Sequence, residues 1–293
     1  NGRLYSVYFS KTITMATVNN DILDHYRKID FSLWQKAMDL YCDKLRKLKK
    51  DESKKVWILQ LYSAYLQLIE VFCINIFAIT ENNLWDNLFL SNRDLKDKID
   101  TRFFIINQNK TRFCTKFTTY LLDNWVFGIK EKSEINNLAD KRKKYTQMLK
   151  EAIEDYLKDY DLLNAYKHGF RVKSHGSNTI TIKAETSNAP TFKIGDFNAS
   201  ISYLTKKKDV VSRHDISFNW ERAMQKAYFL LNMMENTQKI LLNDGKEIQL
   251  DTLAVTNEAE FSKHFGASRF KTPLLQLNKQ LGNYNLTQHR NTS

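Results

Sequence analysis

The chain has few of the residues that shape turns. Its 293 residues include 8 glycines and 2 prolines, about 3% of the total, where roughly 12% is usual. A mostly β protein or a glycine-rich nucleotide-binding fold needs more turn residues than this. The composition therefore predicts a mainly helical protein.

Cysteine is also scarce. Cys42, Cys73 and Cys114 lie far apart and show no Cys-x-x-Cys spacing, which argues against a disulfide framework and a zinc site. The sequence also lacks a glycine-rich phosphate loop, a His-x-x-x-His pair and a nucleophile elbow. We therefore expect no metal and no cofactor, and a cytoplasmic location.

The one long hydrophobic run covers residues 56–80, and a helix of this length could cross a bilayer. Within this run Gln60, Ser63, Gln67 and Glu70 recur at steps of three and four, which draws a polar stripe along a helix. A carboxylate near the middle of a span costs about 2.5–3.5 kcal/mol. The pattern favours the central helix of a soluble bundle, with no membrane contact.

Apolar residues are nevertheless plentiful, at 42% of the chain, enough for a packed core. Their spacing at three and four residues predicts a series of helices. These cover approximately residues 30–50, 55–80, 84–90, 94–108, 112–127, 133–168 and 219–243.

Between the last two of these helices the apolar period changes from 3.6 to 2. Alternation over 179–183, 192–194 and 200–204 predicts a small antiparallel sheet of three or four strands within 171–218. The expected fold is a helical bundle with this sheet inserted before the last long helix, an α+β arrangement. The expected parts are an N-terminal extension (1–20, with Met15 as a candidate start), a bundle (21–170), the sheet (171–218), a returning helix and short strand (219–254), and a loosely ordered tail (255–293).

One helix carries a group of polar residues suited to chemistry. At 100° per residue, Asp161, Asn164 and His168 share one face near the end of the helix at 133–168. Lys167 and Arg171 lie at its exit. A histidine beside a carboxylate transfers protons near neutral pH, and the two cations could hold a phosphate.

These residues also have a purely structural explanation. A histidine in the last turn of a helix interacts favourably with the helix dipole, by about 0.3–1 kcal/mol. Asn164 could serve as a structural hydrogen-bonding residue, and Asp161 could simply be solvated. The sequence leaves both explanations open.

The pattern Asn164-x-x-x-His168 near the end of a long bundle helix resembles the HEPN superfamily. The resemblance implies a helical bundle that dimerises so that two motifs face each other. It also implies either a metal-independent endoribonuclease of toxin–antitoxin or antiviral defence systems, or a relative that has lost catalysis. Leu163 stands where the family has arginine, so Lys167 or Arg171 would have to supply the cation. The alternative pair Arg171 and His175 is one residue short of the family spacing.

Two clusters of basic residues add to a net charge of +12. Each is either a solvated surface or a contact for a nucleic-acid backbone. The first consists of Lys141, Arg142, Lys143 and Lys144, and the second of Lys206, Lys207 and Lys208.

We therefore expect a HEPN-like RNA-associated protein that forms a homodimer, with RNA and an antitoxin or operon partner as candidate partners. If it is an endoribonuclease, His168 would be the acid or base, and Asn164 would orient it or a phosphate oxygen. Lys167 and Arg171 would stabilise charge. The alternative is a non-catalytic interaction module that binds a protein or nucleic acid through its sheet and basic clusters.

Overall fold

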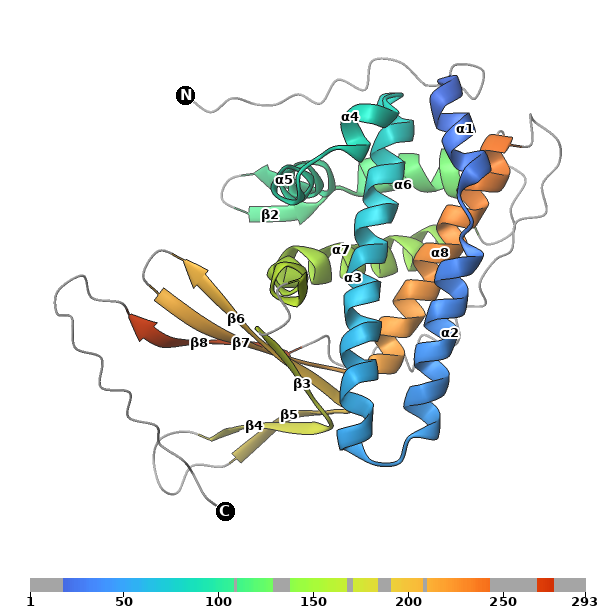
Figure 1. Cartoon of the computed structure of the whole chain (residues 1–293). Helices are drawn as coiled ribbons and strands as arrows, with labels where there is room; N and C mark the ends of the chain where they lie inside the picture. The colour runs from blue at the N-terminus through green and yellow to red at the C-terminus, as the bar shows by residue number, and fades with distance from the viewer. Residues whose placement is uncertain are drawn as a thin grey trace.

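The computed structural model describes residues 18–107, 110–128, 138–167, 171–183, 191–207, 210–242 and 268–276. These residues form a helical bundle with small antiparallel sheets to one side of it (Figure 1). The predicted mainly helical α+β fold, with strands inserted before the last long helix, is confirmed.

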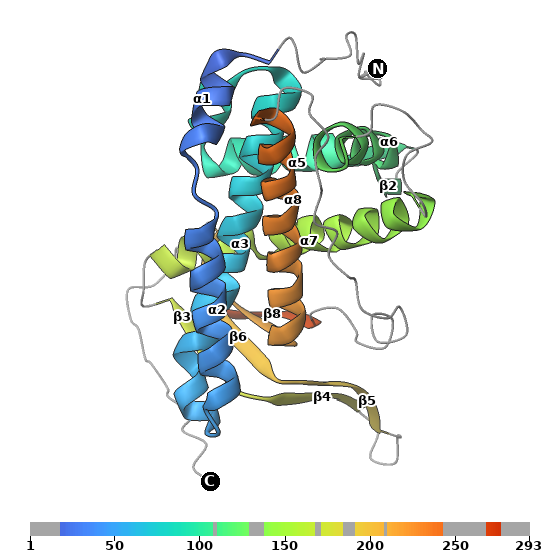
Figure 2. The same ribbon diagram turned by 90° about the vertical axis from the view of Figure 1, so that its right-hand side faces the viewer.

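The bundle is built around α3, a long helix that most of the other helices contact. Figure 2 shows α2 and α8 running alongside α3, while α7 crosses it. α3 is long and apolar enough to cross a membrane, and 67% of its most apolar stretch is buried inside the protein. The helices of this part are α1 (Asn20–Lys28), α2 (Ser32–Lys47), α3 (Asp51–Glu81), α4 (Leu84–Leu88), α7 (Leu138–Lys167) and α8 (Trp220–Leu242).

The region between α4 and α7 differs from the prediction. Helix α5 (Asn92–Phe103) ends before residue 108, and β1 (Phe104–Asn107) and β2 (Lys110–Phe113) form a hairpin. The predicted helix over 94–108 is therefore wrong for 104–107, and the predicted helix over 112–127 is wrong for 112–113. Aromatic residues favour a strand here because Phe104 and Phe113 face each other, with ring centroids 5.4 Å apart. The chain then continues through α6 (Thr115–Leu121) and a π-helical turn, η2 (Leu122–Val126).

The main sheet has four antiparallel strands in the order β3-β6-β7-β8. Three of them come from the predicted region 171–218, but the fourth comes from the tail. The prediction that residues 255–293 are loosely ordered is therefore wrong for β8, and the rest of that range lies outside the described residues. The strands are β3 (Val172–His175), β6 (Ala199–Lys207), β7 (Val210–Phe218) and β8 (Ser268–Gln276), while β4 (Asn178–Lys183) and β5 (Thr191–Phe197) form a separate pair.

Side chains alternate between two faces of the main sheet. On the inner face Ile201, Tyr203 and Ile216 are buried, and Phe218 packs on Tyr62 of α3 with ring centroids 4.2 Å apart. The opposite face is called the outer face below. Its described side chains come from Arg171, Lys173, His175, Ser200, Ser202, Leu204, Lys206, Val211, Arg213, Asp215 and Ser217, as the strand pairing requires.

The sheet is anchored to the start of α3 by Asp51. Its Oδ2 accepts hydrogen bonds from the Ser177 backbone N–H (3.2 Å) and hydroxyl (2.6 Å). Gly176 allows this close approach, because a Cβ at this position would lie 2.5 Å from the Asp51 side chain. The predicted strand within 246–254, the predicted helix start near 133 and most of the predicted extension 1–20 lie outside the described residues.

Candidate functional site

Only part of the Asn164-x-x-x-His168 motif at the end of α7 lies within the described residues. Asn164 is half-buried, and its Oδ1 accepts a hydrogen bond from Asn92 Nδ2 of α5 at 3.4 Å. Leu163 is 1% exposed and belongs to the core, so a cation could not occupy this position without being buried. Lys167 is the last described residue of α7, and His168 lies outside the described residues. The pairing of Asn164 with His168 therefore stays a prediction.

Arg171, predicted as a catalytic residue, lies at the edge of the sheet. Its backbone carbonyl accepts a hydrogen bond from the Leu204 N–H at 2.9 Å, and its side chain is exposed. This pairing puts Arg171 on the outer face with Lys206, one of the predicted nucleic-acid contacts. The side chain of Lys207 and the whole of Lys208 lie outside the described residues.

The other predicted basic cluster, Lys141, Arg142, Lys143 and Lys144, lies at the opposite end of α7. Because an α-helix rises 1.5 Å per residue, residues 141 and 167 are about 39 Å apart along its axis. Arg142 is held in a bidentate pair by Asp123 of η2, with Nε and NH2 at 2.6 and 2.8 Å from the two carboxylate oxygens. This basic cluster and the basic residues of the outer face therefore do not form one continuous surface.

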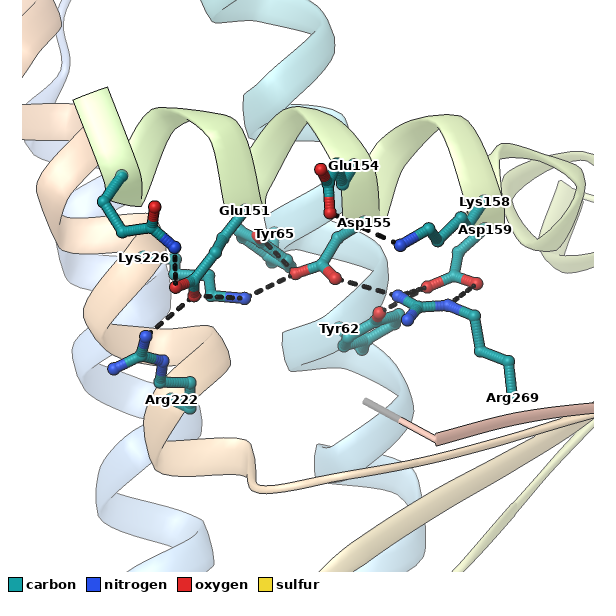
Figure 3. Close-up of polar contacts among 11 residues, drawn as sticks. Tyr62, Tyr65, Glu151, Glu154, Asp155, Lys158, Asp159, Arg222, Lys226 and Arg269 are labelled. Atoms are coloured by element: carbon teal, nitrogen blue, oxygen red, sulfur yellow. Dashed lines mark hydrogen bonds and ion pairs between the residues drawn. The ribbon is translucent and has the colours of Figure 1, made fainter. Parts of the chain in front are cut away.

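A cluster of charged residues that the sequence analysis missed lies between α3, α7, α8 and β8 (Figure 3). Its three acids are on α7 at spacings of four residues, so they share one side of that helix. Two tyrosines of α3 and cations from α8 and β8 meet them. We call this the buried charge network: Tyr62, Tyr65, Glu151, Asp155, Asp159, Arg222, Lys226 and Arg269.

Arg269 of β8 joins two carboxylates of the network. Its Nε and NH2 donate to the two oxygens of Asp159 at 2.7 and 2.6 Å, and NH2 also donates to Asp155 at 2.8 Å. Asp159 accepts a further bond from the Tyr62 hydroxyl at 2.7 Å. Asp155 accepts from Lys226 at 2.7 Å and from the Tyr65 hydroxyl at 3.0 Å.

These contacts determine how the acids ionise. Burial acts to raise the pKa of Asp155, but Lys226 and Arg269 outweigh it and hold that pKa below the ordinary value. Burial raises the pKa of Asp159, against the opposing effect of Arg269. The network has three acids and three cations. Its geometry suits a structural role, because it joins helices α3, α7 and α8 to strand β8. The spacing of Glu151, Asp155 and Asp159 beside the apolar seam of α7 was the one signal for it in the sequence.

The outer face carries a second polar cluster, centred on Ser202. The Ser202 hydroxyl donates to Asp215 Oδ1 at 2.5 Å, and Arg213 NH2 donates to Ser202 Oγ at 3.2 Å. His175 Nε2 lies 3.0 Å from the same oxygen. A catalytic triad places histidine between serine and acid, whereas here serine is in the middle. Ser202 is therefore not an activated nucleophile.

The outer face also concentrates positive charge at its exposed end. Arg171, Lys173, Lys206 and Arg213 are all exposed, and Asp215, paired with Arg213 at 2.9 Å, is the only carboxylate among the described side chains of this face. Such an arrangement is suited to binding phosphate groups. A scan of protein-family models and searches of curated proteins and of solved structures each found no match to this chain.

Proposed function

We propose that this chain is a HEPN-like RNA-associated protein that binds RNA through the outer face of its main sheet. The observation that carries the proposal is the set of four exposed cations on this face, Arg171, Lys173, Lys206 and Arg213. Lys173, Lys206 and Arg213 lie on β3, β6 and β7, and Arg171 immediately precedes β3. The pairing of the strands therefore sets the backbone spacing of these residues before RNA binds. The net charge of +12 adds attraction at long range.

Endoribonuclease activity is the second candidate, because the motif helix leads directly into the RNA-binding strand. Only residues 168–170 separate the end of α7 from Arg171. In this proposal His168 transfers a proton at the scissile phosphodiester, Asn164 orients the reacting groups, and Arg171 with Lys167 supplies the charge that Leu163 lacks. No metal or cofactor takes part, the acting unit is a homodimer, and the biological setting is defence or toxin–antitoxin control in the cytoplasm.

Binding is tested by the salt dependence of RNA affinity. The wild type and a variant with Arg171→Gln, Lys173→Gln and Arg213→Gln would be compared by fluorescence anisotropy on a single-stranded RNA of about 12 nucleotides. Each lost phosphate contact lowers the slope of log K against log salt by about 0.7, so the triple variant should lose about 2 from that slope.

A matched control removes three exposed lysines from other surfaces, with Lys28→Gln, Lys36→Gln and Lys116→Gln. It has the same net charge as the test variant, so equal losses in both would show that binding depends on total charge alone. That result, or no binding by the wild type, would overturn the proposal.

Cleavage is tested separately, with RNA, EDTA and His168→Ala. Metal-independent cleavage that disappears in His168→Ala, at an unchanged melting temperature, supports the nuclease. Binding without cleavage leaves the non-catalytic RNA-binding module, and cleavage that persists in His168→Ala removes His168 as the acid or base.

A further inference from the structure

The hydrogen bonds of the Ser202 cluster assign a proton to one ring nitrogen of His175. A hydroxyl has one donor and two acceptor positions. Ser202 gives its proton to Asp215, because an ionised carboxylate only accepts. It accepts one bond from Arg213, so its remaining contact, with His175 Nε2 at 3.0 Å, must be donated by the imidazole. His175 therefore carries its proton on Nε2, and Nδ1 is left as the ring atom that can take up a second proton.

Charged groups from three elements surround this imidazole. Burial lowers the pKa of His175, and the cations Lys173 of β3, Arg213 of β7 and Lys55 of α3 lower it further, while Asp215 of β7 acts in the opposite direction. Three cations thus face one acid around a ring that is itself only partly buried. His175 is neutral at neutral pH in the free protein, since its pKa lies below the ordinary 6.5.

We infer that His175, with Lys173 and Arg213, forms a subsite that binds one phosphodiester group of RNA and takes up a proton as it binds. This inference rests on the proposed function, because the phosphate belongs to RNA bound on the outer face. The added negative charge offsets the field of the three cations. A proton from solvent then adds to Nδ1, and the imidazolium strengthens the contact with the phosphate; no covalent bond forms or breaks.

Two of the three subsite residues, Lys173 and His175, lie on one face of the short strand β3. Lys173 and His175 alternate with Val172 and Ser174 in β3, and Arg171 immediately precedes the strand, so period 2 brings Arg171, Lys173 and His175 to the outer face. Read as a helical motif, the pair Arg171 and His175 has the wrong spacing. In the extended conformation, Arg171 lies on the same face as Lys173 and His175 of the proposed subsite.

The experiment measures RNA affinity against pH. The probe is a single-stranded oligouridylate of about 12 nucleotides carrying a pH-insensitive dye, because uracil does not titrate between pH 5.5 and 7.5 and the phosphodiester remains ionised throughout. We expect wild-type affinity to rise about three- to tenfold as the pH falls from about 7.5 to about 5.5, the range in which a histidine charges. In His175→Gln this rise should be lost.

Two further variants make the result specific. His214→Gln is the matched control, because His214 lies on β7 but on the inner face, where its Nε2 is 2.8 Å from the Thr205 hydroxyl; its pH dependence should equal that of the wild type. His175→Lys carries a permanent cation, so it should bind tightly at both pH values and respond little to pH. Circular dichroism at each pH establishes that every variant is folded.

The outcomes separate the inference from the proposed function. If RNA binds with the expected salt dependence but His175→Gln keeps the wild-type pH dependence, only the proton-linked subsite is wrong. The same holds if His214→Gln loses the pH dependence instead. If RNA does not bind to the wild type at either pH, the proposed function and this inference both fail.

Discussion

Replacing Arg269 by alanine should destabilise the whole protein, although the residue lies in a strand near the end of the described chain. The Asp159 side chain is 1% exposed. In the variant its carboxylate would lose two guanidinium donors and keep the hydrogen bond from the Tyr62 hydroxyl, at 2.7 Å. Removing one partner of a buried ion pair costs about 3–5 kcal/mol of unfolding free energy. For a chain of this size that corresponds to a fall in Tm of about 6–20 °C.

Urea denaturation followed by circular dichroism would measure this loss, with Arg27→Ala as the control. Arg27 forms an equally short pair with Asp24, 2.6 Å, but both side chains are more than half exposed, so its removal should cost under about 1 kcal/mol. Adding Asp159→Asn to Arg269→Ala should recover much of the loss, because no buried charge is then left unpaired.

The pH dependence gives an independent readout. Without Arg269, burial acts on Asp159 unopposed by the guanidinium and its pKa rises further above the ordinary value. A carboxyl whose pKa is raised in the folded state stabilises the protein at low pH, and this stabilisation is lost as the pH increases. The loss of unfolding free energy in Arg269→Ala should therefore shrink on acidification. A deficit under about 1 kcal/mol at neutral pH, or no recovery in the double variant, would refute the structural role of the network.

Three other substitutions or conditions test separate parts of the structure. Gly176→Ala should lower the unfolding free energy by about 1–3 kcal/mol, measured by urea denaturation, because the new Cβ would lie 2.5 Å from Asp51; an unchanged midpoint would contradict the close approach. Leu163→Arg, which introduces the arginine of the HEPN motif, should cost more than about 3 kcal/mol in the same assay and give no nuclease activity, because the position is 1% exposed; a stable, active variant would contradict that placement. Wild-type stability should fall as the pH drops below about 4.5, since the surrounding cations outweigh burial and hold the pKa values of Glu151 and Asp155 below their ordinary values; a urea midpoint unchanged between neutral pH and about pH 3 would contradict this.

The long helices and the inserted strands were predictable because their signals are local, whereas α1 (Asn20–Lys28) was not predicted. The long apolar run of α3, the seam of α7 and the alternation along β6 each follow from residues close in sequence. The β1–β2 hairpin was missed because Phe104 and Phe113 fit a helix as well as a strand until they are paired with each other. Local patterning cannot supply that contact, which depends on the pairing of β1 with β2.

The candidate site was predicted less well, for a related reason. Arg171 was placed at the exit of a helix, but its position is set by pairing with Leu204, more than thirty residues later. The buried charge network depends on Arg269, which is separated from Asp159 by 110 residues. Contacts of this range leave no periodic trace, so only Glu151, Asp155 and Asp159 could have been suspected from their spacing.

The late position of Arg269 also imposes an order on synthesis. Asp159 leaves the ribosome 110 residues ahead of its guanidinium partner, an interval of about 5–20 s at ordinary translation rates. During that time the helices can collapse, but the nascent bundle holds a carboxylate with its main counter-ion not yet made. The charge network between α7 and the main sheet is therefore completed only after β8 (Ser268–Gln276) has emerged and joined the sheet.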